Sequence, residues 1–229
     1  MKRKGLSGNA WKMIACISML IDHIGASLIE AGVLHSMETY KKVAAYMPWD
    51  WWTIDTVLRV IGRAAFPIYC FLLVEGFFHT RNIKKYGLRL ALFAVISEVP
   101  FDMAFMDRVF YPGYQNVYFT LYFGLLAMML ASKVDKIWVK LLPCGLCMVL
   151  AELAHTDYGA LGVGIISAIY LIHVIRGKTS PETGTQILPK WLYSGERGKA
   201  NLKWFFYLFY PCHLVLLVVI RYLWIGFWV

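Results

Sequence analysis

The sequence predicts an all-α fold: a polytopic transmembrane helix bundle of about seven spans, with the N-terminus inside the cell and the C-terminus outside. Composition, the length of the apolar runs and the placement of basic residues predict it. Of the 229 residues, 59% are hydrophobic and 16% are charged, and the mean hydropathy is +0.57. A soluble domain carries about 25% charged residues. Without a linker that would separate two domains, we expect residues 1–229 to form one transmembrane domain.

Apolar runs of spanning length recur along the chain. A helix needs about 20 mainly apolar residues to cross a hydrocarbon core of about 30 Å. The run at 10–29 contains Asp22 and His23 and lacks a small-residue cleavage site, so we interpret it as a retained span rather than a signal peptide. The runs that we expect to span lie at residues 10–29, 56–78, 87–105, 117–132, 137–153, 158–175 and 204–224. Because the fourth and fifth are short, a six-span alternative stays open, with one of them flat or re-entrant.

Basic residues are distributed unevenly between the two sides that this count predicts. With the N-terminus in the cytoplasm, the inner segments hold Lys and Arg clusters at residues 2–12, 81–89, 133–140 and 176–203. The outer segments hold Lys41, Lys42, Arg108 and Arg221. Since basic residues concentrate in cytoplasmic loops, the asymmetry favours a multi-pass protein of the cell membrane in this orientation.

Neither nucleic-acid binding nor metal chemistry is expected from the composition. The net charge of +9 comes from short clusters between apolar runs, which is typical of membrane topology rather than of a nucleic-acid-binding face. The five cysteines all lie in apolar segments. Cys144 and Cys147 form a CxxC, but no second ligand pair lies nearby in sequence, so we expect packed thiols and no metal.

Ionisable residues in the predicted spans indicate where chemistry takes place. A charged side chain inside a membrane needs a partner or a water-filled cavity. At 1.5 Å per residue, His23 lies about 18 Å into the first span, just past the midplane. Several other spans place polar groups in the same outer half of the bilayer; these are Arg59, Arg63, Glu98, Asp102, Asn116, Thr120, Glu152, His155 and Asp157, with His213 near the middle of the last span.

The spacing of the charged residues predicts how they pair. Arg59 and Arg63 are four residues apart, as are Glu98 and Asp102, so each pair occupies one helix face. Glu98 and Asp102 are the anions whose predicted depth in the membrane is nearest to that of the two arginines. Whether these four residues only hold two helices together stays open. Asp22 and His23 point about 100° apart on a helix, so we expect Asp22 to meet Arg59 or Arg63 rather than to orient His23.

His23 is the strongest catalytic candidate. Its imidazole can act as a general base near neutral pH. His213 follows Pro211, which disrupts the last span, and is a second candidate for orienting a ligand or accepting a proton. Glu75 and His79 lie toward the inner end of the second span, close in sequence to Arg81, Lys84 and Lys85. That basic inner rim would suit an anionic donor, although ordinary topogenic charge explains it equally well.

Six motifs together resemble the TraX family, named for the conjugative-pilin N-acetylase. They are Met-Leu-Ile-Asp-His-Ile-Gly at residues 19–25, Ile-Gly-Arg-Ala-Ala-Phe-Pro-Ile-Tyr-Cys-Phe-Leu-Leu-Val-Glu-Gly-Phe at 61–77, Ser-Glu-Val-Pro-Phe-Asp at 97–102, Gln-Asn-Val-Tyr-Phe-Thr at 115–120, His-Thr-Asp-Tyr-Gly at 155–159 and Phe-Tyr-Pro-Cys-His-Leu at 209–214. The resemblance runs from the first span to the last, so it covers nearly the whole chain.

The resemblance implies a multi-pass acyltransferase that uses acetyl-CoA or another acyl-CoA as donor. By position, His23 maps onto the first-span base of such transferases. We expect His23, Asp22, Arg59, Arg63 and His213 to act in catalysis, with Arg59 or Arg63 stabilising the oxyanion. The acceptor is an unknown peptide, sugar or small molecule. The residues that we expect to bind substrates are Glu75, His79, Arg81, Lys84, Lys85, Glu98, Asp102, Asn116, Thr120, Asp157 and Tyr210.

Two other classes of function stay open. A transporter or proton-coupled channel also uses buried Asp, Glu, His and Arg, and proline-broken helices favour it. The chain lacks the paired half-repeats of many transporters. A structural assembly subunit would explain the helices but not the many buried charges.

Overall fold

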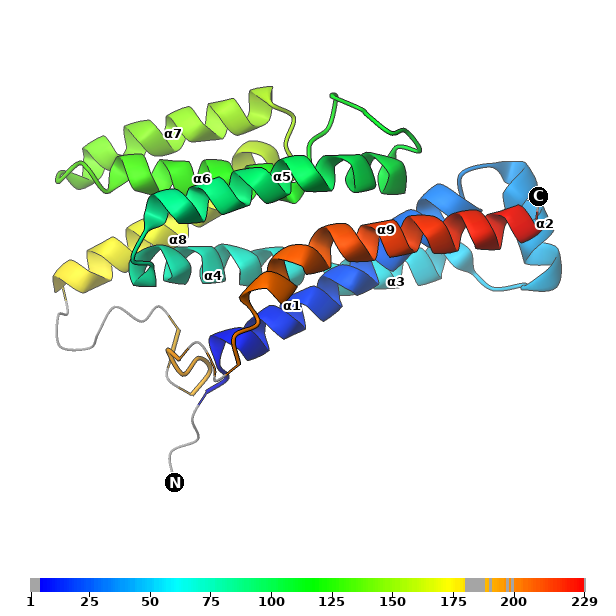
Figure 1. Ribbon diagram of the computed structural model, residues 1–229, viewed down its shortest axis with the longest axis horizontal. Helices are drawn as coiled ribbons and strands as arrows, with labels where there is room; N and C mark the ends of the chain where they lie inside the picture. The colour runs from blue at the N-terminus through cyan, green and yellow to red at the C-terminus, as the bar shows by residue number, and fades with distance from the viewer. Residues whose placement is uncertain (1–4, 180–187, 190, 197, 199, 229) are drawn as a thin grey trace. The chain divides into compact units, whose positions relative to one another are not determined.

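The fold is all-helical in the computed structural model, which describes residues 5–179, 188–189, 191–196, 198 and 200–228 (Figure 1). Only helices and two isolated bridges occur in these residues, so the all-α part of the predicted fold is confirmed. The elements, in chain order, are α1 (Gly8–His23), the π-helix η1 (Ile24–Val33), α2 (Met37–Tyr46), α3 (Trp51–Gly62), α4 (Ala65–His79), α5 (Ile83–Phe105), α6 (Val117–Ala131), α7 (Ile137–Leu153), α8 (Gly159–Thr179) and α9 (Lys203–Trp228).

Among the described residues, four helical stretches are long and apolar enough to cross a membrane. They are Gly8–Val33, which joins α1 to η1; Trp51–His79, which joins α3 to α4; Gly159–Gly177 in α8; and Lys203–Trp224 in α9. They correspond to the first, second, sixth and seventh predicted spans. The length and composition of these helices therefore indicate a multi-pass membrane protein.

The other three predicted spans exist as helices but are shorter or more polar. The helix α6 has 15 residues and α7 has 17, which at 1.5 Å per residue gives them lengths of about 22 and 26 Å. The helix α5 is long enough, with 23 residues, but it carries five charged side chains: Lys84, Lys85, Arg89, Glu98 and Asp102. A count of seven spans, and the sides on which the two termini lie, stay predictions.

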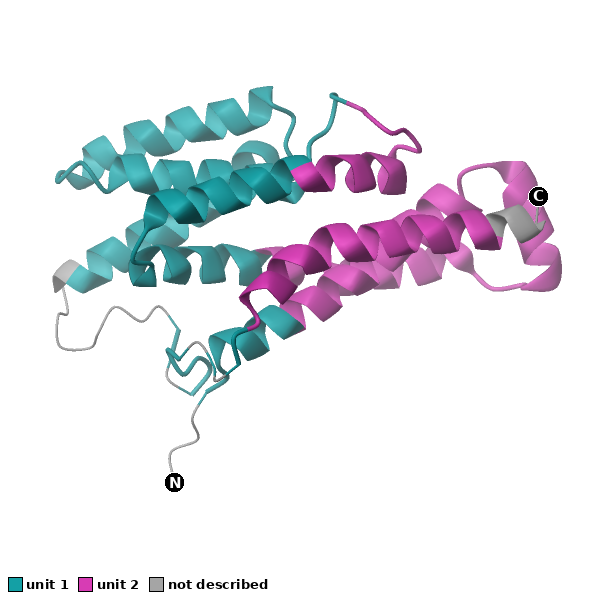
Figure 2. Cartoon of the chain, in the orientation of Figure 1, with its two compact units in different colours: residues 1–13, 67–95, 112–201 teal, residues 14–66, 96–111, 202–229 magenta. Residues whose placement is uncertain are grey.

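The chain divides into two compact units, each assembled from separate segments (Figure 2). Unit 1 contains residues 1–13, 67–95 and 112–201, and unit 2 contains residues 14–66, 96–111 and 202–229. The chain passes from one unit to the other within α1, α4 and α5. That all 229 residues act as one domain stays a prediction.

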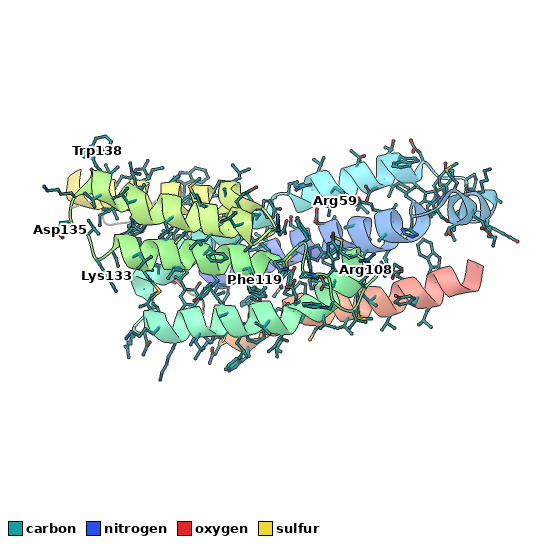
Figure 3. All side chains as sticks on the ribbon, turned by 90° about the horizontal axis from the view of Figure 1, so that it is seen from above. Arg59, Arg108, Phe119, Lys133, Asp135 and Trp138 are labelled. Atoms are coloured by element: carbon teal, nitrogen blue, oxygen red, sulfur yellow. The ribbon has the colours of Figure 1, made fainter. Side chains whose placement is uncertain are left out.

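In unit 1, α6, α7 and α8 pack against one another. Gly124 allows α6 to approach α8 closely, because a Cβ at this position would lie 2.4 Å from Cδ1 of Ile166. Figure 3 shows Lys133 and Asp135 at the turn between α6 and α7, with Trp138 on the first turn of α7. This turn presents polar groups beside an exposed indole, a combination typical of the membrane–water interface.

In unit 2, η1 packs against both α3 and α9, and α2 covers η1 and α9. A small core forms there from Ile29, Val33, Val43 and Trp51. Two close approaches bring α3 to the first helix. A Cβ on Gly62 would lie 2.1 Å from Cβ of Asp22, and Oγ of Ser18 donates to the carbonyl oxygen of Ile61 at 2.9 Å. The first helix is therefore held against α3 around Asp22 and His23.

Candidate functional site

His23 lies where the first helix changes its winding. It is the last residue of α1 and precedes the ten-residue π-helix η1. Most π-helical segments are single-turn bulges, and they are frequent at functional sites because the i→i+5 pattern displaces side chains from their α-helical positions. The change of winding therefore adds a local structural reason to regard His23 as a functional residue.

The ring of His23 contacts the ring of His213 from α9. Nδ1 of His23 lies 2.7 Å from Nε2 of His213. The two ring centroids are 4.9 Å apart and the planes differ by 12°. Both side chains are buried, with exposed fractions of 9% for His23 and 5% for His213. Residues 190 positions apart in the chain thus form one buried imidazole pair.

A backbone carbonyl fixes the tautomers of this pair. Nδ1 of His213 lies 2.7 Å from the carbonyl oxygen of Phe209. A carbonyl can only accept a hydrogen bond, so we infer that Nδ1 of His213 carries the proton. Nε2 of a neutral His213 is then the acceptor, and Nδ1 of His23 is the donor. Nε2 of His23 consequently keeps a lone pair, which is the form that a general base requires.

Aromatic rings surround the two imidazoles. The ring of Phe209 stacks on His213, with centroids 4.8 Å apart and planes 21° apart. Phe105 and Tyr210 meet His23 edge-on, at 5.1 and 5.8 Å between centroids. These rings limit rotation of the imidazoles and reduce the access of water. Tyr210 was predicted from sequence as a substrate-binding residue; Phe105 was not, because no polar group distinguishes it from the other aromatic residues.

Asp22 binds Arg59, as the angle between neighbouring helical side chains predicted. Nη1 of Arg59 donates to Oδ2 of Asp22 at 2.6 Å, and Nε lies 4.0 Å from Oε2 of Glu30. Arg59 belongs to α3, whereas Asp22 and Glu30 belong to the first helix. Arg63 is exposed at the end of α3 and interacts electrostatically with Asp22. A fixed cation therefore contacts Asp22, which is the sequence neighbour of the candidate base His23.

The expected pairing of the arginines with Asp102 is not formed among the described residues. Asp102 is fully buried, and its Oδ2 accepts a hydrogen bond from the backbone N–H of Tyr111 at 2.6 Å. Through this bond, Asp102 fixes the position of the segment that follows α5 instead of binding one of the two arginines. Glu98 is also buried, one turn earlier on the same helix. The prediction was wrong for Asp102 because depth in a span does not fix the direction in which a side chain points.

Asn116, Thr120 and Asp157 come together in unit 1 and connect two loops. Asn116 caps α6 through Tyr118 N–H and donates to the carbonyl oxygen of Ala94 at 2.8 Å. Thr120 donates to the backbone carbonyl of Asp157. The hydroxyl of Tyr114 lies 2.8 Å from Oδ1 of Asp157. These bonds give the three residues a structural role, while their contact with substrate stays a prediction.

Glu75 and His79 lie one turn apart on α4, in unit 1. Nδ1 of His79 is 2.8 Å from the backbone carbonyl oxygen of Glu75 and 3.6 Å from its Oε2. The basic residues Arg81, Lys84 and Lys85 are exposed where α4 connects to α5. His173 from α8, which sequence reasoning missed, stacks on Phe78 with centroids 3.9 Å apart. Its position among apolar residues of a spanning helix gave no signal of a polar neighbour.

The comparisons with known proteins agree with the helical architecture and the motifs. The family model described as TraX protein matches residues 7–182. The chain belongs to the TraX family. A curated relative of this TraX-family chain is the probable fimbrial assembly protein FimC, serogroup H1, of Dichelobacter nodosus. It is 28% identical over 248 aligned positions, which cover 90% of this chain and 92% of the relative. No solved structure matches the chain significantly.

The matched part of the TraX-family chain contains most of the site. Asp22, His23 and Arg59 lie within residues 7–182, as do Glu75 and the basic residues between α4 and α5. Tyr210 and His213 lie beyond the matched residues. In the described part of the chain, no group of three or more His, Cys, Asp or Glu side chains has the arrangement of a metal site. The imidazole pair is accordingly the most distinctive chemical feature of the described residues.

Proposed function

We propose that this TraX-family protein is a multi-pass membrane acyltransferase of the cell membrane, which moves an acetyl or other acyl group from acyl-CoA to an amine or hydroxyl. In this proposal, His23 is the general base and His213 is its positioning residue. The observation that carries the proposal is the hydrogen-bonded series from the Phe209 carbonyl through His213 to His23, because it leaves Nε2 of His23 with an available lone pair.

The proposed step uses that lone pair directly. Nε2 of His23 takes the proton from the acceptor's N–H or O–H while the acceptor atom attacks the thioester carbonyl carbon. The resulting tetrahedral intermediate collapses when its C–S bond breaks, and the CoA thiolate takes the proton back from His23. A general base of this kind contributes about 10²- to 10⁴-fold to rate. His213 keeps the reactive nitrogen bare by accepting from Nδ1 of His23.

Arg59 is the proposed stabiliser of the oxyanion. Its guanidinium has five N–H donors, and Asp22 uses one nitrogen, Nη1, at 2.6 Å. Arg63, which is exposed, is the alternative in the same role. A fixed cation near developing negative charge is worth several kcal/mol in a site that excludes water, on the order of 3 kcal/mol for one donor.

The donor and acceptor are proposed from charge and from the curated relative. Exposed Arg81, Lys84 and Lys85 can bind the phosphates of CoA, with His79 beside them. The relative is named a probable fimbrial assembly protein. That name supports a fimbrial or pilus subunit as the acceptor, through an amine or hydroxyl that its folding leaves available.

The test is acyl transfer by the full-length protein purified in detergent. We expect release of CoA thiol from acetyl-CoA that depends on an added peptide amine, and a decrease of about 10²- to 10⁴-fold in His23→Ala. His35→Ala, which changes an exposed histidine after η1, is the matched control and should retain the wild-type rate. Binding of acetyl-CoA, measured separately, should be unchanged in His23→Ala. A His23→Ala variant that retains the wild-type rate would exclude His23 as the base.

A transporter or proton-coupled channel remains the competing proposal, and the partly buried ion pair of Asp22 with Arg59 is also compatible with it. Flux of protons or solutes in liposomes, together with no CoA-dependent transfer, would favour that class.

A further inference from the structure

We propose that Glu75, His79 and His173 form a proton-binding site in unit 1, with Glu75 as the buried proton acceptor and His79 as its connection to water. The site lies outside the imidazole pair of unit 2. The proposal goes beyond acyl transfer and does not depend on it.

The buried carboxyl group of Glu75 lacks the partners that a carboxylate needs. The residue is 3% exposed. Within the described residues, neither Oε1 nor Oε2 receives a hydrogen bond, and both atoms are buried from water. An ionised carboxylate in such surroundings is very unfavourable, whereas the neutral acid is far less so. A proton is the one ligand small enough to satisfy this group without moving the helices around it.

His79 provides a connection from Glu75 to the surface. Its Nδ1 lies 3.6 Å from Oε2 of Glu75, and its side chain is 63% exposed, against 4% for Glu75. It ends α4 immediately before the exposed residues Arg81, Lys84 and Lys85, a polar stretch that indicates an aqueous side. An exposed imidazole can pass a proton between water and a buried group, so His79 is suited to deliver a proton inward.

His173 adds a second buried group without hydrogen-bond partners. It is 2% exposed, and neither ring nitrogen has a partner in the described part of the chain. Phe78, three residues after Glu75 on α4, stacks on the imidazole of His173. His173 also interacts electrostatically with His79. Two unpartnered polar side chains from α4 and α8 therefore adjoin the same exposed histidine.

The titratable groups around Glu75 come from three segments. His79 lies on its own helix, His173 belongs to α8, and the Tyr193 hydroxyl approaches from the segment before α9 and interacts electrostatically with Glu75. The proposed exchange moves one proton. It leaves the His79 imidazolium and joins the Glu75 carboxylate, which gives a neutral imidazole and a carboxylic acid. Water then returns a proton to His79.

The test uses a hydrophobic carbodiimide, which adds across a protonated carboxyl group and leaves a stable acylurea on it. The full-length protein in detergent is treated at pH 7 and the label is located by peptide mass mapping. We expect label on Glu75, none at that position in Glu75→Gln, and at least about tenfold less on exposed Glu152, because water and the N–H of Ala160 can stabilise a charged carboxylate there. The infrared spectra of wild type and Glu75→Gln provide a second measurement, because a protonated Glu75 gives a carboxylic-acid C=O band that the variant lacks. If Glu75 stays unlabelled and the two spectra show the same C=O bands, the proposal is overturned.

The role of His79 has its own measurement. After transfer to D₂O, the infrared C=O band of a buried carboxylic acid shifts as its proton exchanges. We expect His79→Gln to slow that shift at least about tenfold while the band itself remains, because the imidazole that exchanges protons near neutral pH is gone. His35→Gln, at an exposed histidine of unit 2, should leave the rate unchanged. An unchanged rate in His79→Gln would exclude His79 as the connection to water.

Discussion

Nδ1 of His23 lies 2.7 Å from Nε2 of His213, and the two imidazole planes differ by only 12°. The contact joins the end of α1 to the middle of α9. Because Phe209 fixes the proton on the far nitrogen of His213, the contact has a direction: His23 donates and His213 accepts. The pair is thus chemically asymmetric, and its two members are expected to respond differently to substitution.

Replacing His213 tests the positioning role. In His213→Ala, Nδ1 of His23 loses its acceptor, so the tautomer with a bare Nε2 is no longer enforced. We expect kcat for acyl transfer to decrease about 10- to 100-fold with little change in KM. His213→Gln places an amide oxygen near the position of Nε2 and should recover most of that loss. Equal activities of the Ala and Gln variants would contradict the positioning role.

Removing Arg59 leaves Asp22 without its cation inside the helix bundle. Both side chains are partly exposed, at 27% and 17%, so we expect Arg59→Ala to destabilise the protein by about 1–3 kcal/mol, less than for a fully buried pair. Thermal unfolding in detergent measures the change. Asp22→Asn in the same chain should restore part of the stability, because the uncompensated charge is gone. A double variant less stable than Arg59→Ala would indicate that Asp22 is held by other groups.

A methyl group at Gly62 should disturb the packing of α3 on α1. The Cβ would lie 2.1 Å from Cβ and 2.7 Å from Cα of Asp22, and a backbone atom cannot move aside cheaply. We expect Gly62→Ala to cost about 1–3 kcal/mol, as for an overpacked core, and to lower the midpoint of thermal unfolding. Gly145→Ala on α7 is the control, since its Cβ meets nothing within 4 Å. The packing model fails if both variants unfold at the wild-type temperature.

The cap of α3 should depend on pH. Asp50 accepts hydrogen bonds from the hydroxyl of Thr53 at 2.6 Å and from its N–H at 3.1 Å, and these hold the pKa of the Asp50 carboxyl below its ordinary value of 3.8. Because the pKa is lowered in the folded state, the Asp50 carboxylate stabilises the fold at pH values above its ordinary pKa of 3.8. This stabilisation is lost as the pH falls through the lowered pKa of the folded state.

We therefore expect the unfolding temperatures of wild type and Asp50→Ala to differ at pH 6 and to converge as the pH falls through the lowered pKa of Asp50. Asp50→Asn keeps an acceptor for the cap and should lie between them at pH 6. A difference that does not change with pH would indicate that the cap does not depend on the charge.

The sequence was sufficient for the fold class and the positions of the helices. Hydrophobic runs are long and continuous in this chain, so the bounds of α6 and α7 agree with the predicted runs at 117–132 and 137–153 to within one residue. The second predicted span was placed from residue 56, whereas α3 begins at Trp51. Its first turn contains Trp51 and Trp52 and lies outside the predicted run.

The pairs within the site could be predicted only where the spacing restricts direction. Asp22 and His23 are neighbours on a helix, so their divergence followed from geometry, and of the two partners expected for Asp22, Arg59 and Arg63, the hydrogen bond is formed by Arg59. The contact between His23 and His213 did not, because depth in a span leaves rotation about each helix axis undetermined. The same uncertainty produced the wrong partner for Asp102 and concealed His173, which lies among apolar residues of a spanning helix.

The two neighbours at the end of α1 are fastened to different helices: Asp22 to α3 through Arg59, and His23 to α9 through His213. Because their side chains point about 100° apart, the two contacts hold the helix on different sides. A rotation of the first helix about its own axis would move both side chains away from their partners. The rotational position of the first helix within unit 2 is therefore set by two contacts on different sides of it.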